Sequence, residues 1–316
     1  MNYRLVAPAV FLLFPAFACA QDAAAWLASQ GLAARDVKTF EDIQVAIGAP
    51  KEGDEKVVVL RQGKPLWQSS PKDAPPGSKW TIHAVGRDLT GDGHPDAHLT
   101  SYTGGANCCT THHVLQLKPQ VKRVAVQSTG SVSGSEFIEI PGRKAPVMIS
   151  ADDSSANVFA PFATSYFPLV VLEVRNGRLH LARDLMQSKL PAQAPAICAT
   201  PAPASNAWLR ERCNEFGTVR RGERVSYIKQ RLEAVKSTRS GDKIKWQEYV
   251  DKGAASAVAA ELNRYAYTGH GAAGLRWLET IWPGNDEIKA QLVTNLRQTH
   301  AKSAFAEDLA SLAAGR

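Results

Sequence analysis

The sequence predicts two structural parts, an antiparallel, mainly-β domain followed by an all-α domain. Short apolar segments alternate with turn residues between about residues 37 and 185, which is typical of antiparallel sheets. A segment rich in proline and alanine follows at 189–205. Beyond it, apolar residues recur at helical spacing, which favours a unit of about four or five helices.

The first twenty residues have the pattern of a cleaved secretory signal. Arg4 precedes an apolar run from Val6 to Phe17, and Ala18-Cys19-Ala20 supplies small residues before the expected cut. Acylation of Cys19, as in a lipoprotein, is the alternative, although Phe17 fits poorly beside such a cysteine. The apolar run is too short to span a bilayer, and no later segment approaches the required length. We therefore expect a periplasmic or secreted bacterial protein without a transmembrane segment after processing.

The β domain is predicted over residues 21–188 and opens with a short helix at 23–34. Two hairpins are indicated inside it. The first joins 57–60 to 65–67 across a glycine turn, and the second joins 169–174 to 179–181 across Asn176-Gly177, which suits a type I′ turn. The remaining strands are predicted at 80–85, 97–102, 113–117, 124–126, 137–140 and 147–149.

A linker is predicted at 189–205, because its prolines oppose a regular helix. The helical domain is predicted over 206–316. Val225, Ile228, Leu232 and Val235 share one helical face, and a later helix is predicted to begin at Asn285 as its N-cap. The other helical segments are predicted at 254–267 and 301–313, with an apolar cluster at 277–282.

The stretch 88–96, Asp-Leu-Thr-Gly-Asp-Gly-His-Pro-Asp, carries the most specific chemical signal in the chain. Its oxygen-bearing residues alternate at the spacing of a calcium loop. The predicted ligands are the side chains of Asp88, Thr90, Asp92 and Asp96 and the main-chain carbonyl of His94. Calcium would relieve repulsion among three close carboxylates. The alternative is a hairpin turn that binds no ion, since aspartate and glycine are common in turns.

An EF-hand is excluded because the twelfth position of this loop is Leu99 rather than glutamate, and the flanks are strand-like. The loop between two strands resembles the calcium loops of integrin-α-type FG-GAP (VCBS-like) repeats. The continuation from Leu99 to Val114 also resembles a block of uncharacterised exported bacterial proteins. The resemblance implies a β-propeller-like or related sheet domain without an established activity. A second loop near 150–157 lacks the Gly-Asp-Gly core, so Asp152 and Asp153 are weak ligand candidates.

Four cysteines follow the signal, namely Cys108, Cys109, Cys198 and Cys213. An even number in an exported protein favours disulfides, with three possible connectivities. A bridge from Cys198 to Cys213 would close a short loop and stabilise the fold by roughly 3 kcal/mol. Adjacent Cα atoms lie about 3.8 Å apart, below the about 4.4–6.8 Å of ordinary disulfides. A bridge between Cys108 and Cys109 would therefore be strained, although the preceding Gly104-Gly105 makes an unusual turn easier to form. A vicinal disulfide and separate cysteines, either reduced or cross-paired, are both open alternatives.

A metal or redox site remains a further alternative at this point, because His112 and His113 follow the vicinal cysteines closely. Adjacent residues of a strand point to opposite faces, which opposes a shared ion. No common catalytic motif occurs elsewhere. Two Ser-x-x-Lys matches, at 69–72 and 226–229, lack their accompanying motifs, and His270 falls in a predicted inter-helix loop.

The formal net charge of +7 comes without an aromatic-interleaved basic stripe, so no nucleic-acid partner is expected. The expected function is that of an exported calcium-binding protein that binds an envelope protein or polysaccharide without catalysis. One alternative is an envelope hydrolase acting on polysaccharide or peptidoglycan, with an active site assembled from distant residues. Another is an inhibitor or immunity-type partner of an envelope protein.

Overall fold

A computed structural model describes residues 18–105, 108–132, 134–236, 245–282 and 287–314, with the side chains of residues 18–22 and 108 excepted. The described strands form three four-stranded antiparallel sheets, and they close no propeller ring. The predicted antiparallel β region is therefore confirmed in its coarse form. The predicted signal at 1–20 and the predicted N-cap Asn285 lie wholly or mostly outside the described residues.

Each sheet follows the chain in order. The first sheet contains β1 (Ala33–Phe40), β2 (Ile43–Ala49), β3 (Lys56–Arg61) and β4 (Lys64–Gln68). The second contains β5 (Lys79–Arg87), β6 (Asp96–Gly105), β7 (Cys108–Gln116) and β8 (Lys122–Gly130). The third contains β9 (Glu136–Ile138), β10 (Val147–Ala151), β11 (Leu169–Arg175) and β12 (Arg178–Leu181).

Helices flank this stack at both ends. Helix α1 (Ala18–Ser29) precedes the strands, and η1 (Phe162–Thr164) lies between β10 and β11. The short elements α2 (Arg183–Met186), η2 (Ala196–Ala199) and α3 (Ala202–Ser205) follow β12 and lead to the main helices. The helical part comprises α4 (Ala207–Asn214), α5 (Thr218–Lys236), α6 (Trp246–Asp251), α7 (Ala254–Tyr267), α8 (Gly271–Ile281), α9 (Glu287–Lys302) and α10 (Ala306–Ala313). It thus contains more helices than the four or five predicted.

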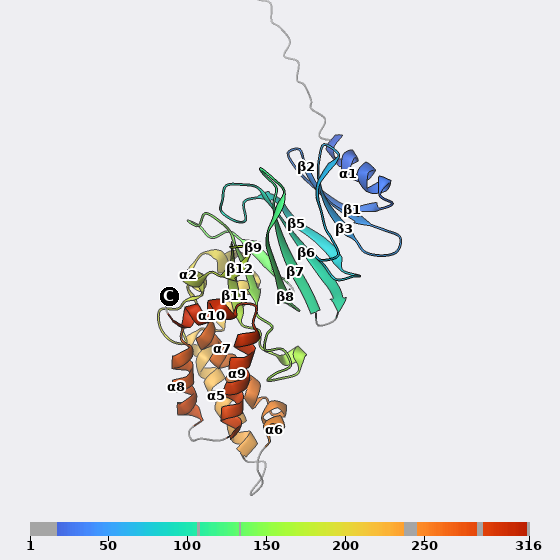
Figure 1. The fold of residues 1–316 in the computed structure, drawn as a ribbon. Helices are drawn as coiled ribbons and strands as arrows, with labels where there is room; N and C mark the ends of the chain where they lie inside the picture. Colours follow the sequence, from blue (N-terminus) through green and yellow to red (C-terminus); the bar gives the residue numbers. More distant parts are fainter. Residues whose placement is uncertain (1–17, 106–107, 133, 237–244, 283–286, 315–316) are drawn as a thin grey trace, which may run out of the picture.

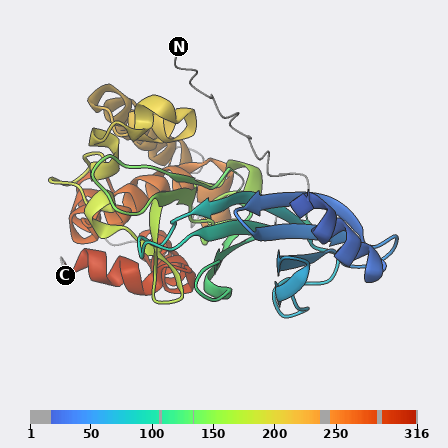
Figure 2. The ribbon, with the colours of Figure 1, turned by 90° about the horizontal axis from the view of Figure 1, so that it is seen from above.

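The elements form successive layers from α1 through the three sheets to the helices (Figures 1 and 2). The first sheet is buried on both faces, because Val58 packs toward α1 while Val57 and Val59 pack toward the second sheet. This explains the continuous apolar run at 57–60, since only a strand covered on one face needs to alternate. At Gly48 a Cβ would approach Leu27 to 2.5 Å, so glycine lets α1 pack closely.

One apolar core joins the third sheet to the helical part. Ile149 and Val171 of the sheet share it with Leu309 of α10. Ile197 and Ala202, from the segment predicted as a linker, are also buried in this core. A second core lies within the helices and includes Leu232, Val258 and Leu292. The segment at 189–205 is therefore packed against the molecule over part of its length.

Both predicted hairpins are present. Strands β3 and β4 pair across Gln62 and Gly63, and β11 and β12 pair across Asn176 and Gly177. Asn176 and Gly177 have φ values of 49° and 84°, as a type I′ turn requires. Local turn chemistry therefore determined these two connections correctly.

Candidate functional site

The predicted calcium loop connects β5 to β6 at the edge where the second sheet approaches the core shared with the third sheet. Leu89, next to Asp88, is fully buried in that core and anchors the loop. Gly91 and Gly93 have φ values of 77° and 89°, which favour glycine over other residues. The loop is thus held from below by an apolar side chain and turned by two glycines.

The carboxylates of Asp88 and Asp92 organise the loop backbone. Asp88 accepts hydrogen bonds from the N–H groups of Gly91 (2.6 Å) and Gly93 (2.8 Å). Asp92 accepts a hydrogen bond of 2.8 Å from the His94 N–H and one of 2.6 Å from the Gln116 amide of β7. The first two acidic positions of the motif therefore share one compact turn.

Asp96 is the buried acid of the loop and is inaccessible to solvent. Its Oδ2 accepts hydrogen bonds from the N–H groups of Leu89 (2.8 Å) and Thr90 (3.2 Å). Its Oδ1 is buried without a hydrogen-bond partner among the described residues. Burial, and then the charges of Asp92 and Asp88, raise the pKa of Asp96 to about 6. A buried carboxylate oxygen without a donor is costly unless a cation or proton satisfies it.

The pKa of Asp92 shifts in the direction opposite to that of Asp96. Hydrogen bonds from the His94 N–H, Thr90 and Gln116 lower the pKa of Asp92 although burial acts to raise it. Asp92 therefore stays ionised while Asp96 retains a proton more easily. A carboxylate has about four lone-pair sites, so the N–H bonds to Asp88 and Asp92 leave acceptor capacity for a cation.

Within the described part of the chain, no three His, Cys, Asp or Glu side chains gather as ligands of one metal ion. In the loop the oxygens of Asp88 accept from N–H groups of the turn, and those of Asp92 accept from the turn and from Gln116 of β7. The predicted set also relies on the Thr90 hydroxyl and the His94 carbonyl. Calcium, which takes six to eight oxygens in flexible geometry, would have to draw these groups together.

Asp152 and Asp153 perform structural tasks away from the loop. Asp152 accepts a hydrogen bond of 2.5 Å from the Tyr267 hydroxyl and another from Ser303, and so ties β10 to the helices. Asp153 accepts a hydrogen bond of 2.8 Å from the N–H of Ser131. These contacts account for both acids without an ion.

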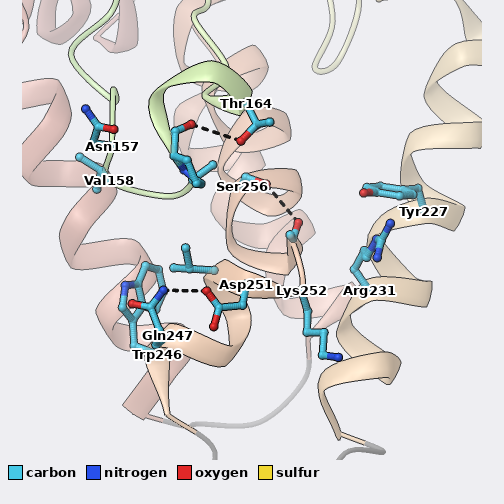
Figure 3. A pocket seen from close by; sticks show the side chains of 14 residues that line it. Asn157, Val158, Thr164, Tyr227, Arg231, Trp246, Gln247, Asp251, Lys252 and Ser256 are labelled. Carbon is cyan, nitrogen blue, oxygen red and sulfur yellow. Dashed lines mark hydrogen bonds between the residues drawn. The ribbon is translucent and has the colours of Figure 1, made fainter.

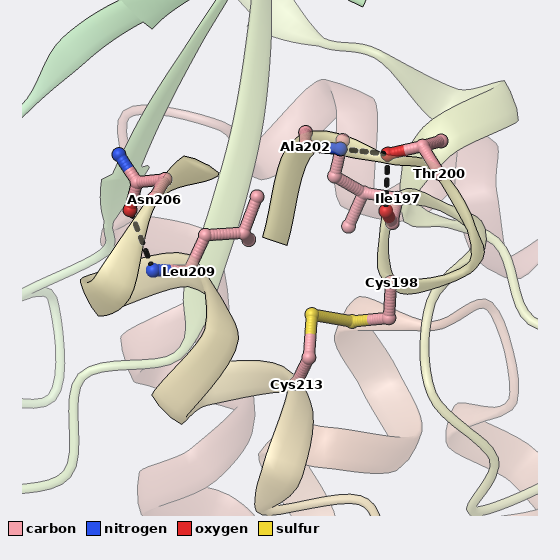
Figure 4. Close-up of a disulfide and its surroundings, with 7 residues drawn as sticks. All are labelled: Ile197, Cys198, Thr200, Ala202, Asn206, Leu209 and Cys213. Carbon is pink, nitrogen blue, oxygen red and sulfur yellow. Dashed lines mark hydrogen bonds between the residues drawn. A yellow bond between two sulfur atoms is a disulfide. The ribbon is translucent and has the colours of Figure 1, made fainter. Parts of the chain in front are cut away.

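Cys198 and Cys213 form a disulfide with a Cα–Cα separation of 5.4 Å, as predicted (Figure 4). It joins η2 to α4 beside the buried side chains of Ile197 and Leu209. Disulfides are typical of oxidising compartments. Cys109 is also disulfide-bonded, whereas the Cys108 side chain lies outside the described residues.

His112 and His113 point to opposite faces of β7, as strand geometry predicts. His112 Nδ1 lies 2.9 Å from His98 Nε2, and its Nε2 lies 3.1 Å from the Thr129 hydroxyl. His113 instead packs against Trp80 with ring centroids 4.8 Å apart. The two histidines therefore cannot share an ion.

A row of three histidines, which no sequence pattern predicted, lies on the face of the second sheet that meets the third. His83 stacks on His98, and His98 stacks on His112, with ring centroids 4.7 and 5.2 Å apart. Burial lowers the pKa of His98 to about 2 and that of His112 to about 3. These rings are neutral at physiological pH. Histidines in three consecutive strands were the available signal, but their alignment depends on strand register.

Other sequence candidates have structural roles. His270 Nε2 lies 3.0 Å from the carbonyl oxygen of Ser188. Ser69, in one Ser-x-x-Lys match, accepts a hydrogen bond of 2.9 Å from the N–H of Val57. Trp80 and Trp282 are buried in apolar cores. None of these observations assigns catalysis.

A cavity of about 820 Å³ opens in the helical part (Figure 3). Its walls come from three places, the loop after β10, helix α5, and the stretch from α6 into the start of α7. Trp246 and Gln247 lie on one side, and Tyr227 and Arg231 lie on the other. No feature of the sequence pointed to this cavity, because it joins segments that are up to about 100 residues apart.

Comparisons of the chain with protein-family models, curated proteins and solved structures find no match. The FG-GAP resemblance therefore stays a prediction that rests on the loop residues. Among the described helices, none is both long and apolar enough to cross a bilayer.

Proposed function

We propose that this chain is an exported calcium-binding protein whose role is binding at the cell envelope rather than catalysis. The observation that carries the proposal is the buried Asp96, whose Oδ1 lacks a donor in the described structure while Asp88 and Asp92 act on it electrostatically. One calcium ion held by Asp88, Thr90, Asp92, the His94 carbonyl and Asp96 would satisfy that oxygen. It would also offset the repulsion of the three acids.

The ion has an architectural role in this proposal. The loop lies between β5 and β6 and contacts β7 through Gln116, so its order influences three strands of one sheet. Extracellular calcium modules hold the ion at about 10⁻⁴ to 10⁻³ M. The secretory pattern at 1–20 and the Cys198–Cys213 disulfide support an oxidising location outside the cytoplasm.

The spacing of the loop resembles that of FG-GAP repeats, which supports calcium rather than magnesium. Magnesium demands near-octahedral geometry and usually keeps several waters. A loop with one buried carboxylate and a main-chain carbonyl suits the larger, more flexible shell of calcium. The expected selectivity is therefore calcium over magnesium.

Isothermal titration of the mature protein with calcium tests the site. Saturable heat in the parent and its loss in Asp92→Asn are expected, because the variant removes a charged ligand with little change in shape. Glu52→Gln is the matched control, since this exposed acid lies outside the loop and its loss should leave the titration unchanged. Absence of heat in the parent, or equal heat in parent and Asp92→Asn, contradicts the proposal.

A further inference from the structure

The cavity in the helical part has a cationic wall. Tyr227 and Arg231 lie one turn apart on α5, and the guanidinium carbon of Arg231 lies 4.7 Å from the centre of the Tyr227 ring. Arg231 Nε is buried and has no hydrogen-bond partner among the described residues. Lys252, which directly follows α6, lies between Asp251 and Arg231 (Figure 3).

No acid of the described chain forms an ion pair with Arg231 or Lys252. A guanidinium held against an aromatic ring and left without an acid partner favours a planar anion that can accept two parallel hydrogen bonds from its accessible edge. A carboxylate has this geometry. The cationic wall therefore points to a ligand that carries a carboxylate group.

The opposite wall has a different chemistry. Trp246 begins α6, and the Phe159 ring packs against it edge-on with centroids 6.4 Å apart, which fixes its orientation. Gln247 donates a hydrogen bond of 2.8 Å to Asp251, so an amide and a carboxylate stand together beside the indole (Figure 3). An aromatic face flanked by such groups suits a ring that has apolar C–H faces and hydroxyl groups at its edge.

The chemistry of the two walls together suits a sugar that carries a carboxylate group. Asp251 accepts from hydroxyls but repels carboxylates, so it orients the acid group of a ligand away from α6 and toward Arg231. The volume of about 820 Å³ falls within the about 300–1,000 Å³ of small-molecule sites and accommodates more than one sugar unit. A peptide would not require the hydroxyl-binding wall.

We propose that this cavity binds a carboxylate-bearing saccharide, with the carboxylate on Arg231 and Lys252 and a sugar ring against Trp246. The inference names the ligand class of the envelope-binding role proposed above, and it rests on that role. It assigns the saccharide to the helical part and leaves calcium in the sheet region. The two sites are therefore separable by experiment.

Titration of the mature protein with digalacturonic acid, and with the neutral disaccharide of two galactose units, tests the inference by calorimetry. We expect saturable binding of the acidic disaccharide and at least tenfold weaker binding of the neutral one. Arg231→Gln should weaken the acidic ligand about tenfold or more and bring it close to the neutral one, since a charged hydrogen bond contributes roughly 1.5–3 kcal/mol. Trp246→Ala should weaken both.

Arg276→Gln is the matched control, because this exposed arginine of α8 lies away from the cavity and should leave both affinities unchanged. Circular dichroism of each variant establishes that it is folded. No saturable binding of either disaccharide to the parent overturns the inference. Equal affinity for both disaccharides contradicts the role assigned to the carboxylate. Displacement of the acidic disaccharide by equimolar inorganic phosphate would show instead that the cavity binds small anions.

A repeat of the saccharide titration with Asp92→Asn separates the two proposals. Unchanged saccharide binding in that variant is expected, because the cavity shares no residue with the loop. A failure of calcium binding would then leave the saccharide result standing, and a failure of saccharide binding would leave the calcium titration intact. Loss of saccharide binding in Asp92→Asn contradicts the separation of the two sites.

Discussion

Asp96 is the acid of the loop whose negative charge is least favourable in the folded state. Its carboxylate is buried, two N–H groups satisfy one oxygen, and the other oxygen has no donor among the described residues. A fixed negative charge in this position is unfavourable without a cation. Calcium binding, protonation of this carboxylate and the stability of the fold should therefore depend on one another.

Replacement of Asp96 by asparagine should separate stability from calcium binding. Because the folded-state pKa is raised from 3.8 to about 6, the contribution of this group to stability is lost as pH rises through about 6. The calcium-free Asp96→Asn protein should therefore melt at or above the temperature of the calcium-free parent at neutral pH. The melting temperature should rise with calcium in the parent alone. A calcium-dependent rise in the variant would contradict the ligand role.

Calcium affinity should fall in acid because protons compete for the same carboxylate. With the pKa of Asp96 near 6, affinity should decrease about tenfold for each pH unit below that value while this group alone titrates. Calorimetry at a series of pH values from neutral to about 5 measures the slope. The Asp96→Asn variant provides the comparison, and a flat profile in the parent would exclude Asp96 as a ligand.

At the scale of the elements, the second sheet holds its histidines neutral. Burial lowers the pKa of His98 to about 2, of His112 to about 3 and of His113 to about 4. The rings contact Phe137, Trp80 and one another, and no acidic group of the described residues compensates a proton on His98 or His112. Between about pH 4 and 6.5 these histidines are therefore neutral in the folded protein but protonated in the unfolded chain.

The protein should consequently lose stability as pH falls from about 6.5 toward 4. Each histidine whose pKa is lowered by folding binds one proton more in the unfolded state than in the folded state. In that window this difference changes the free energy of unfolding by about 1.4 kcal/mol per pH unit. Asp96 acts in the opposite direction with a single proton, so a net loss is expected. Urea unfolding at several pH values measures it, and stability that is constant or rises toward pH 4 would contradict the neutral row.

Individual hairpins and helices were predicted most accurately from the sequence. The turn residues Asn176-Gly177 predicted the last hairpin, and the segment 254–267 predicted α7 with its observed bounds. These depend on neighbours along the chain. The alignment of His98 with His112 was not predictable, since a register shift by one residue would turn either ring to the other face.

At the scale of the whole molecule, the third sheet and the helices are fastened by a buried polar contact. Tyr267 of α7 donates a hydrogen bond to Asp152 at the end of β10, and Ser303 donates to the same oxygen. Burial, and then the charge of Asp152, raise the pKa of Tyr267 well above 10, so its hydroxyl remains a donor. The contact lies beside the core that the sheet and helices share.

Removal of this hydroxyl should weaken the fold. Tyr267→Phe leaves a buried carboxylate with one donor fewer, which should cost about 1–3 kcal/mol in the free energy of unfolding. Tyr102→Phe is the control, because the exposed hydroxyl of Tyr102 donates to the nearby Gly105 carbonyl at the surface and its loss should change stability little. Equal stabilities of the two variants in urea unfolding would contradict a stabilising role for the Tyr267–Asp152 hydrogen bond between the helices and the third sheet.

The sequence by itself determined the parts that depend on local chemistry. These are the β region followed by helices, both hairpins, and the loop spacing that predicts calcium; for Cys198 and Cys213 the sequence favoured a bridge, which the structure contains. Only the tertiary structure decided that the sheets stack as three separate layers, that Asp96 lies buried, that three histidines align, and that Trp246 faces Arg231 across a cavity. The physical reason is that short turns and periodic patterns are encoded by neighbouring residues, whereas layers and cavities arise where distant apolar faces meet.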